Sequence, residues 1–219
     1  MPVSSRSLSL LPTIENLGRL TKSLAILDAI IEPEWEYRYF SFNSKWDTDE
    51  QMASLRNGQG DEWFCVFSKV GAFLKGFDHE SMMSPWNANP RAVWKGILDQ
   101  VPDAFKHYVA EPAFSMDNTT FCVWRGMNDN VWHTGRIDYP EGDDPDGSER
   151  LLYVLEGRPE DYKEWADSYY ECAVDLDAVK AIYVHTPLSP ELVSKLNPDR
   201  DMESLRADIE QIGYRVSAI

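Results

Sequence analysis

The chain has little cysteine, with 3 residues among 219. Cys65, Cys122 and Cys172 are widely spaced and odd in number, so they do not predict the paired disulfides that hold small secreted domains together. Apolar residues make up 43% of the sequence, which is enough for a large core without covalent cross-links. These features predict a protein of the reducing cytoplasm.

Long apolar runs are also missing. The most apolar stretch, Leu24–Ile31, is interrupted by Asp28 and followed by Glu32 and Pro33, whereas a membrane-spanning helix needs about 20 apolar residues. The first residues, MPVSSRSLSLLP, contain no apolar segment of the ~7–15 residues found in signal peptides. We therefore expect neither membrane association nor export, and we predict a cytoplasmic location.

No motif for a cofactor or a metal ion stands out. The glycines form neither GxGxxG nor GxxxxGK[ST], the phosphate-binding loops of dinucleotide-binding and P-loop proteins. The acidic turn before Gly147 does not match a calcium loop, because Gly142 and Tyr153 would take two ligand positions that need carboxylates. The sequence therefore predicts no cofactor and no metal site.

Basic residues are scarce relative to acidic ones. The chain has 21 lysines and arginines against 37 aspartates and glutamates, which gives a net charge of -16. The imbalance is concentrated in residues 138–177, where fourteen carboxylates and three basic side chains leave 11 net negative charges. This segment would repel the phosphates of a nucleic acid. It favours a partner protein with a basic surface, although selection for solubility would produce the same charge.

The chain begins with a predicted helix and strand. Apolar residues recur every three or four positions over residues 14–31, with Thr13 as a candidate N-cap and Pro33 after the last turn. Aromatic residues then alternate with charged ones from Trp35 towards Phe42, which is typical of a strand. A sheet is therefore expected to begin at Trp35.

Two hairpins are predicted further along. Their aromatic and β-branched strands are Glu62–Ser68, Ala72–Phe77, Thr119–Arg125 and Val131–Asp138. The polar segment 47–60 is expected to be a loop with at most one helical turn, and helices are expected over 90–100 and 102–109. The sheet would thus be interrupted between the two hairpins.

The last third of the chain is predicted to be mainly helical. Helices are expected from Pro159 to about Cys172, from Pro190 after the N-cap Ser189, and from Asp201 or Met202 to Ile212, with a short strand over 181–184. The complete pattern predicts an α+β protein with an antiparallel sheet of five or six strands covered by helices. One domain over residues 1–219 is the simplest organisation, and two lobes divided near residue 139 are the alternative.

The first candidate site is the acidic helix that begins at Pro159. Its aromatic and apolar positions, which include Tyr162 and Tyr169, share one helical face, and carboxylates occupy much of the other. The candidate partner-binding residues are Glu160, Asp161, Glu164, Asp167, Tyr169, Tyr170 and Glu171. Such a surface would attract a basic partner through charge and anchor it through tyrosine. A solvated helix face is the structural alternative.

The second candidate site follows the first hairpin. Asp78, His79 and Glu80 are consecutive at a strand end, where reactive groups often gather, and His133 would come from the second hairpin. An imidazole beside carboxylates can act as a general base or bind a metal ion. This arrangement would indicate a hydrolase or a metal-dependent enzyme. A capped loop without catalytic function explains the same residues.

The block GDEWFCVFSKVGAFLKGFDHESMMSPW, together with FCVWR, VWHTGRIDYP and YKEWADSYYE, resembles an uncharacterised family of soluble bacterial proteins. The resemblance covers most of the chain and implies a cytoplasmic bacterial protein, but it assigns no activity. The acidity and size are also similar to those of immunity proteins, without a shared motif. We therefore expect a non-enzymatic acidic binding protein, an immunity or inhibitor protein for example, and keep the enzyme as the alternative.

Overall fold

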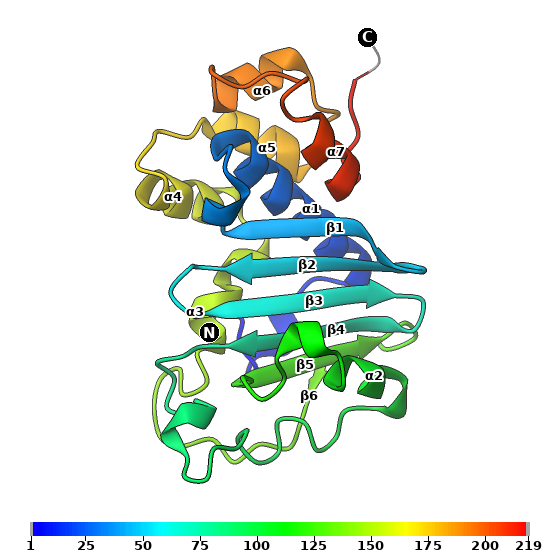
Figure 1. Cartoon of the computed structure of the whole chain (residues 1–219), viewed down its shortest axis with the longest axis vertical. Coiled ribbons are helices and arrows are strands. Elements are labelled where there is room, and N and C mark those ends of the chain that lie inside the picture. Colours follow the sequence, from blue (N-terminus) through cyan, green and yellow to red (C-terminus); the bar gives the residue numbers. More distant parts are fainter. Residues whose placement is uncertain (1, 218–219) are drawn as a thin grey trace.

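The computed structural model describes residues 2–217 and has an α+β fold. One antiparallel sheet contains six strands in the order β1-β2-β3-β4-β5-β6, so each strand lies beside its neighbour in sequence (Figure 1). The strands are β1 Phe40–Asp47, β2 Glu50–Arg56, β3 Glu62–Ser68, β4 Gly71–Phe77, β5 Phe121–Gly126 and β6 His133–Thr134. This meander brings the turns between strands to the two ends of the sheet.

Helices occupy one long segment near the start and most of the last third. The α-helices are α1 Ile14–Ile31, α2 Lys106–Val109, α3 Ser148–Leu152, α4 Pro159–Tyr169, α5 Leu176–Tyr183, α6 Pro190–Leu196 and α7 Arg206–Ile212. Short 3-10 turns are η1 Leu8–Leu10, η2 Trp35–Tyr37, η3 Pro85–Asn87, η4 Asp103–Phe105, η5 Pro112–Phe114 and η6 Tyr153–Glu156. Among residues 2–217, no helix combines the length and the apolar character that crossing a membrane requires.

The two faces of the sheet belong to two separate apolar cores. In β3, Cys65 packs in the core that contains α1 and the C-terminal helices, while Phe64 and Val66 pack in the other core. The second core is closed by α2 and the segment 85–118, which lies in front of the lower strands in Figure 1. Because neighbouring residues of a strand point to opposite faces, nearly continuous apolar runs were needed to bury both faces.

Several predicted elements are confirmed. Helix α1 has the predicted bounds, and its N-cap Thr13 accepts a hydrogen bond from Asn16 N at 3.3 Å. The first hairpin forms β3 and β4, and α6 begins after its N-cap Ser189. Gly213 ends α7 with a φ of 70°, as expected for a helix C-terminus.

Other predicted elements are wrong. The expected loop 47–60 contains strand β2, and the expected strand 181–184 lies largely within helix α5. Segment 90–100 forms turns rather than a helix. The expected strand 131–138 is reduced to the two residues of β6, and residues 35–37 form the turn η2, so β1 begins only at Phe40.

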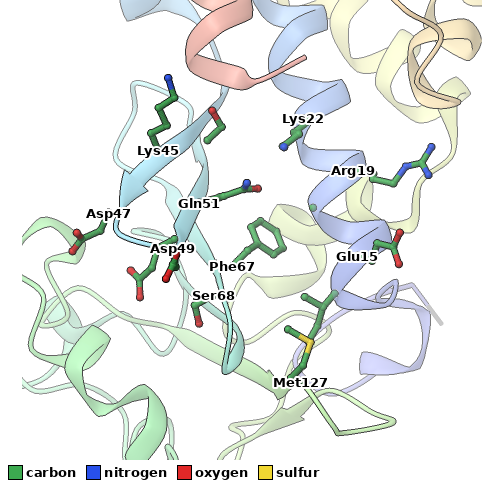
Figure 2. Close-up of a pocket in the computed structure, with 14 residues that line it drawn as sticks. Glu15, Arg19, Lys22, Lys45, Asp47, Asp49, Gln51, Phe67, Ser68 and Met127 are labelled. Atoms are coloured by element: carbon green, nitrogen blue, oxygen red, sulfur yellow. The ribbon is translucent and has the colours of Figure 1, made fainter. Parts of the chain in front are cut away.

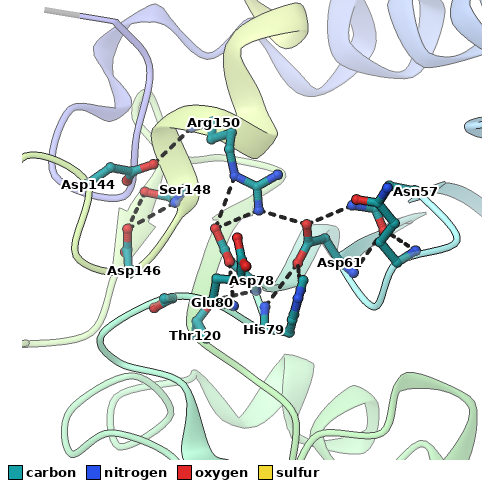
Figure 3. Close-up of polar contacts among 12 residues, drawn as sticks. Asn57, Asp61, Asp78, His79, Glu80, Thr120, Asp144, Asp146, Ser148 and Arg150 are labelled. Atoms are coloured by element: carbon teal, nitrogen blue, oxygen red, sulfur yellow. Dashed lines mark hydrogen bonds and ion pairs between the residues drawn. The ribbon is translucent and has the colours of Figure 1, made fainter. Parts of the chain in front are cut away.

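The strand register defines where a site can form. Glu62 in β3 is paired with Phe77 in β4. Asp61, which precedes β3, and Asp78, which follows β4, are therefore neighbours at the same end of the sheet. Helix α3 arrives at this end from a distant part of the sequence (Figure 3).

Candidate functional site

Asp61 and Asp78 form the centre of a polar cluster at this sheet end. Their exposed fractions are 4% and 5%, so both carboxylates have left most of their water. A buried carboxylate is costly unless hydrogen bonds and opposite charges compensate it. The neighbouring side chains supply both kinds of partner to Asp61.

His79 binds Asp61 with its backbone and its ring. The backbone N–H donates to Asp61 Oδ1 at 2.9 Å, and Nδ1 lies 2.7 Å from the same oxygen. The side chain of His79 is 40% exposed, so the rest of the imidazole faces solvent. Asn57 holds the other carboxylate oxygen of Asp61 through its Nδ2 at 2.7 Å.

Arg150 bridges the two carboxylates. Its Nη2 lies 2.7 Å from Asp61 Oδ2 and 2.7 Å from Asp78 Oδ2, and its Nε donates to Asp78 Oδ2 at 3.2 Å (Figure 3). A planar guanidinium can satisfy two carboxylates in this way because its donors point in fixed directions. The arginine thereby links α3 to the ends of β3 and β4.

The loop before α3 fixes the position of Arg150. Asp144 accepts hydrogen bonds from the backbone N–H groups of Glu149 and Arg150, each at 3.0 Å, and so caps the start of α3. Gly147 has a φ of 74°, and a Cβ built on it would lie 2.1 Å from Asp78 Oδ2. Only glycine allows the loop to approach Asp78 this closely.

A second polar network fastens the start of the chain to the same loop. Ser5 donates its backbone N–H to Ser148 Oγ at 2.9 Å, and its hydroxyl binds Asp146 and lies 2.9 Å from Tyr139 OH. Asp146 is 1% exposed and also accepts from Ser148 N at 3.0 Å. Burial raises the pKa of Asp146, against the effect of these hydrogen bonds. The N-terminal segment is therefore part of the support for α3.

The charges of the Arg150 cluster reinforce one another. Burial alone would raise the pKa of Asp61, but the hydrogen bonds from His79 and Arg150 outweigh it and hold this pKa below its ordinary value. The hydrogen bond to Asp61 raises the pKa of His79. Although burial opposes it, the contacts with Asp78 and Asp61 raise the pKa of Arg150. All three effects favour the charged forms.

This arrangement is chemically compensated. Asp61, Asp78 and His79 each place one ligand atom within 4.8 Å of the others, a separation that a metal ion can bridge. However, the guanidinium of Arg150 already contacts both carboxylates, so an ion would have to displace it. In this arrangement, the ion pairs of the cluster join the start of β3, the end of β4 and α3.

Glu80 and His133, the other two residues of the predicted catalytic set, do not contact this cluster through their side chains. Glu80 donates its backbone N–H to Asp78 Oδ1 at 3.0 Å, and its side chain is exposed. His133 is paired with Trp124, which in turn is paired with Phe73 in the opposite half of β4 from Asp78. Because six residues of extended strand span about 20 Å, His133 and His79 cannot share a substrate or a metal ion.

The predicted acidic surface of α4 is largely neutralised by lysine and arginine. Glu160 pairs with Lys180 at 2.9 Å. Asp161 pairs with Arg158 at 2.7 Å, and Asp167 pairs with Lys163. Three of the five carboxylates are therefore compensated within the protein, which weakens the expectation that the whole helix forms an acidic interface.

The other predicted partner-binding residues lie at or near the end of α4. Glu164 and Glu171 are exposed and make no ion pair among residues 2–217. Tyr169 is 40% exposed, whereas Tyr170 is half-buried. Only the C-terminal end of the predicted surface therefore keeps the combination of free carboxylate and accessible aromatic ring.

A second exposed aromatic group adjoins this end of α4. Trp35 and Tyr37 in η2 are 53% and 59% exposed. Tyr39, two residues further on, packs against Tyr169 with ring centroids 5.2 Å apart. We define the acidic–aromatic surface as Glu34, Trp35, Glu36, Tyr37, Tyr169 and Glu171. Its three glutamates are exposed and form no ion pair in the described part of the chain.

Behind this surface lies a buried carboxylate that forms no ion pair with any of residues 2–217. Asp28 in α1 is 0% exposed and accepts from Phe40 N at 2.7 Å, Tyr39 N at 3.0 Å and Tyr162 OH at 2.8 Å. Tyr170 is a further hydroxyl donor. Burial raises the pKa of Asp28 to about 7, against the lowering effect of these hydrogen bonds. Asp28 thus joins α1, β1 and α4 behind the aromatic rings.

Sequence reasoning had missed Asp61, Arg150 and the exposed aromatics of η2. Asp61 immediately precedes a correctly predicted strand, so pairing of β3 with β4 would have placed it beside Asp78. Arg150 lies 72 residues beyond Asp78, and no local pattern marks it. The sequence pattern predicts a strand over Trp35 and Tyr37, and two residues at this spacing would share one face of the sheet, which is expected to be buried.

No family model, curated protein or solved structure matches this chain. Inference about function therefore depends on the side chains described above.

Proposed function

We propose that this protein is a non-enzymatic acidic binding protein that engages the basic surface of a protein partner. The contact is the acidic–aromatic surface formed by η2 and the end of α4. The observation that carries the proposal is the exposure of Trp35 and Tyr37, by 53% and 59%, beside glutamates that form no ion pair within residues 2–217. A cytoplasmic location, and the resemblance to a soluble bacterial family, belong to the same proposal.

The aromatic residues would supply most of the binding energy. Tryptophan and tyrosine dominate the energetics of protein interfaces, because they bury a large rigid surface and retain a polar atom for hydrogen bonding. Large apolar side chains that gather on the surface of a soluble protein commonly mark an interaction site. Tyr169 adds an accessible ring next to Tyr39, which follows η2 in the chain.

The carboxylates would supply orientation and speed. Glu34, Glu36 and Glu171 surround the aromatic residues, and the chain as a whole carries a charge of -16. Complementary charge raises the association rate and rejects partners of the wrong sign. An acidic surface of this kind favours a basic protein and disfavours nucleic acid and anionic lipid. An inhibitor or immunity protein for a basic enzyme is one role that fits.

The enzyme alternative receives less support from the geometry. Asp61 and Asp78 are both compensated by Arg150, and His133 lies in the other half of the sheet. The Asp61–His79 pair remains the feature that an enzyme would use. Its exposed ring has no hydroxyl or thiol partner among the hydrogen bonds of residues 2–217.

Paired charge reversals test the proposal. Partners are captured from the native cell at low salt with the wild type, with Glu34→Lys/Glu36→Lys, and with Asp99→Lys/Asp117→Lys. The two variants change the net charge equally, but the second places its lysines in the exposed part of segment 85–118. We expect the first variant to slow association with the captured protein about tenfold and to flatten its salt dependence. Equal retention of the partner by both variants would contradict the proposal.

Truncation of a single aromatic side chain tests whether the exposed rings contribute to binding. Trp35→Ala removes an exposed ring that contacts Arg56 at 5.6 Å, so we expect little loss of stability. Its effect should fall on the dissociation rate of the complex, with a loss of roughly thirtyfold in affinity if Trp35 is an interface anchor. Met127→Ala, which truncates a side chain of similar exposure at another place, is the matched control.

A further inference from the structure

A cleft lined by α1 and the sheet lies away from the acidic–aromatic surface. It lies between the first half of α1 and strands β1, β2 and β3, and its volume is about 640 Å³ (Figure 2). Ligand pockets in proteins commonly have volumes of about 300–1,000 Å³. The cleft is therefore large enough for a small organic molecule.

The charges in this cleft are separated in space. Lys22 and Lys45 lie towards one end, while Asp47 and Asp49 lie at the turn between β1 and β2 at the other end (Figure 2). Phe67 lies between the two groups and forms the floor. A cationic end, an apolar middle and an anionic end match a molecule with a carboxylate and an amine separated by an apolar body.

Lys22 is the distinctive residue of the cationic end. Its side chain points from α1 towards β1 and β2, and its Nζ lies 5.0 Å from the centre of the Phe42 ring. Among residues 2–217 it forms no ion pair, although the chain has 16 more acidic than basic groups. Burial lowers the pKa of Lys22, because part of the water around its ammonium group is replaced by protein.

The nearest helix end does not provide an acceptor for this ammonium. Gly213 at the C-terminus of α7 lies close to Lys22, but the carbonyl oxygen of Gln211 accepts its hydrogen bond from Ser44 Oγ at 2.8 Å. The C-terminal end of a helix favours a cation in general. The C-terminus of α7 makes the electrostatic potential near Lys22 more negative, while the N–H groups of the Lys22 ammonium remain available for an anion.

The floor of the cleft is kept open by a glycine. Gly18 lies within α1, where glycine is unfavourable relative to alanine. A Cβ at this position would lie 3.7 Å from the nearest Phe67 ring atom, an ordinary contact that the fold would tolerate. Packing therefore does not require Gly18, and the missing Cβ leaves more room beside the Phe67 ring.

We propose that this cleft binds a short zwitterionic peptide, with its carboxylate at Lys22, its apolar side chain on Phe67 and its amino group towards Asp49. Gln51, whose amide also points into the cleft, lies between the two charged ends (Figure 2). The site is separate from the acidic–aromatic surface and does not depend on the protein–protein contact proposed above.

Titration of the intact protein with the dipeptide alanyl-phenylalanine, followed by two-dimensional NMR of backbone amides, tests this assignment. We expect saturable shifts confined to α1 and the ends of β1–β3, with a dissociation constant of about 1 mM. The N-acetylated and the C-amidated dipeptides should bind about tenfold more weakly, because each lacks one charged contact. The absence of saturable shifts, or equal binding of the capped dipeptides, would overturn the proposal.

Two variants make the test specific. Lys22→Gln should weaken binding about tenfold, whereas Lys195→Gln, which changes an exposed lysine of α6, should not. Gly18→Ala should raise the thermal midpoint and at the same time weaken binding, because the added methyl covers part of the Phe67 ring. If Lys22→Gln and Gly18→Ala both bind the dipeptide as the wild type does, the ligand does not occupy this cleft.

Discussion

Asp28 and Asp61 are both buried carboxylates, but their surroundings shift their pKa values in opposite directions. Asp28 is surrounded by backbone N–H groups and tyrosine hydroxyls, and burial raises its pKa to about 7. Asp61 has Arg150 and His79 as additional partners, and its pKa is lowered despite its burial. Neutral donors satisfy the hydrogen-bonding capacity of a buried carboxylate, whereas a neighbouring cation also stabilises its negative charge.

The difference corresponds to the position of each residue in the fold. Asp28 lies at the junction of α1, β1 and α4, where a long cationic side chain would have to displace aromatic rings. Asp61 lies at the end of the sheet, where Arg150 keeps 48% of its side chain in contact with solvent. The cationic partners therefore favour the charged form of Asp61, whereas the pKa of Asp28 is raised to about 7, so the charge of Asp28 depends on pH near neutrality.

Removal of the shared cation should have the largest effect. Arg150→Met keeps a long side chain but leaves Asp61 and Asp78 close together without a positive charge between them. We expect the free energy of unfolding to fall by about 3 kcal/mol, the lower end of the range for a broken buried pair, because Arg150 is partly exposed. Urea denaturation measures this. Arg158→Met, which breaks pairs that an exposed arginine makes with Glu156 and Asp161, should destabilise the protein much less, and equal losses would refute a special role for Arg150.

Replacement of the Asp28 carboxyl group should have an intermediate effect with a distinctive pH dependence. Asp28→Asn places an NH₂ group among hydrogen-bond donors, and we expect a loss of about 2 kcal/mol at pH 5. In the wild type the folded state keeps its proton up to about pH 7, while the unfolded state releases it near 3.8, so wild-type stability falls as the pH rises through this window. The deficit of the variant should therefore shrink between pH 5 and 8. A constant deficit would show that Asp28 does not titrate in this range.

The smallest effect is expected at His79. Its folded-state pKa is raised above 6.5 by Asp61, so its contribution is complete below pH 6.5 and disappears as the pH rises through the folded-state value. His79→Gln should lose about 0.5 kcal/mol at pH 6, as for an exposed pair, and less at pH 9. Thermal unfolding at both pH values checks this, with His133→Gln as the control because the His133 side chain has a longer contact with a carboxylate, to Asp129 at 3.5 Å. A loss that does not vary with pH would assign His79 a packing role alone.

Elements with strong local signals could be predicted from the sequence. Helix α1 has a regular apolar repeat and an N-cap, and β3 and β4 are rich in aromatic and β-branched residues around a glycine turn. In these segments local preference and tertiary packing agree. The fold class followed from them, because two antiparallel strands and a long amphipathic helix already define the layers.

The wrong predictions concern segments that depend on distant contacts. Strand β2, EQMASLR, contains no aromatic or β-branched residue and is held by pairing with strands on both sides. Segment 90–100 has helical spacing, but Gly96 has a φ of 97°, and a Cβ there would lie 2.3 Å from the carbonyl oxygen of Arg136. This close approach ends any helix and cannot be deduced from neighbouring residues.

The candidate site was only partly predictable for the same reason. Asp78 and His79 were found because they are adjacent at the end of a recognisable strand. Arg150 was not, since its distance from Asp78 in sequence is 72 residues and its position depends on Gly147 and Asp144. The acidic residues of α4 were correctly seen as a charged face, but their pairing with Lys163 and Lys180 appears only when side-chain positions are known.

The attachment of Ser5 to the loop before α3 has a mechanical consequence. Val3 N donates to Glu156 Oε1 at 2.9 Å, and Ser5 is held by Ser148 and Asp146, so a force applied to the start of the chain is transmitted first to the residues that carry Arg150. Pulling from this end should rupture the guanidinium contacts before the strands separate. Pulling from the opposite end should instead peel away the C-terminal helices and leave that contact intact until late in the extension.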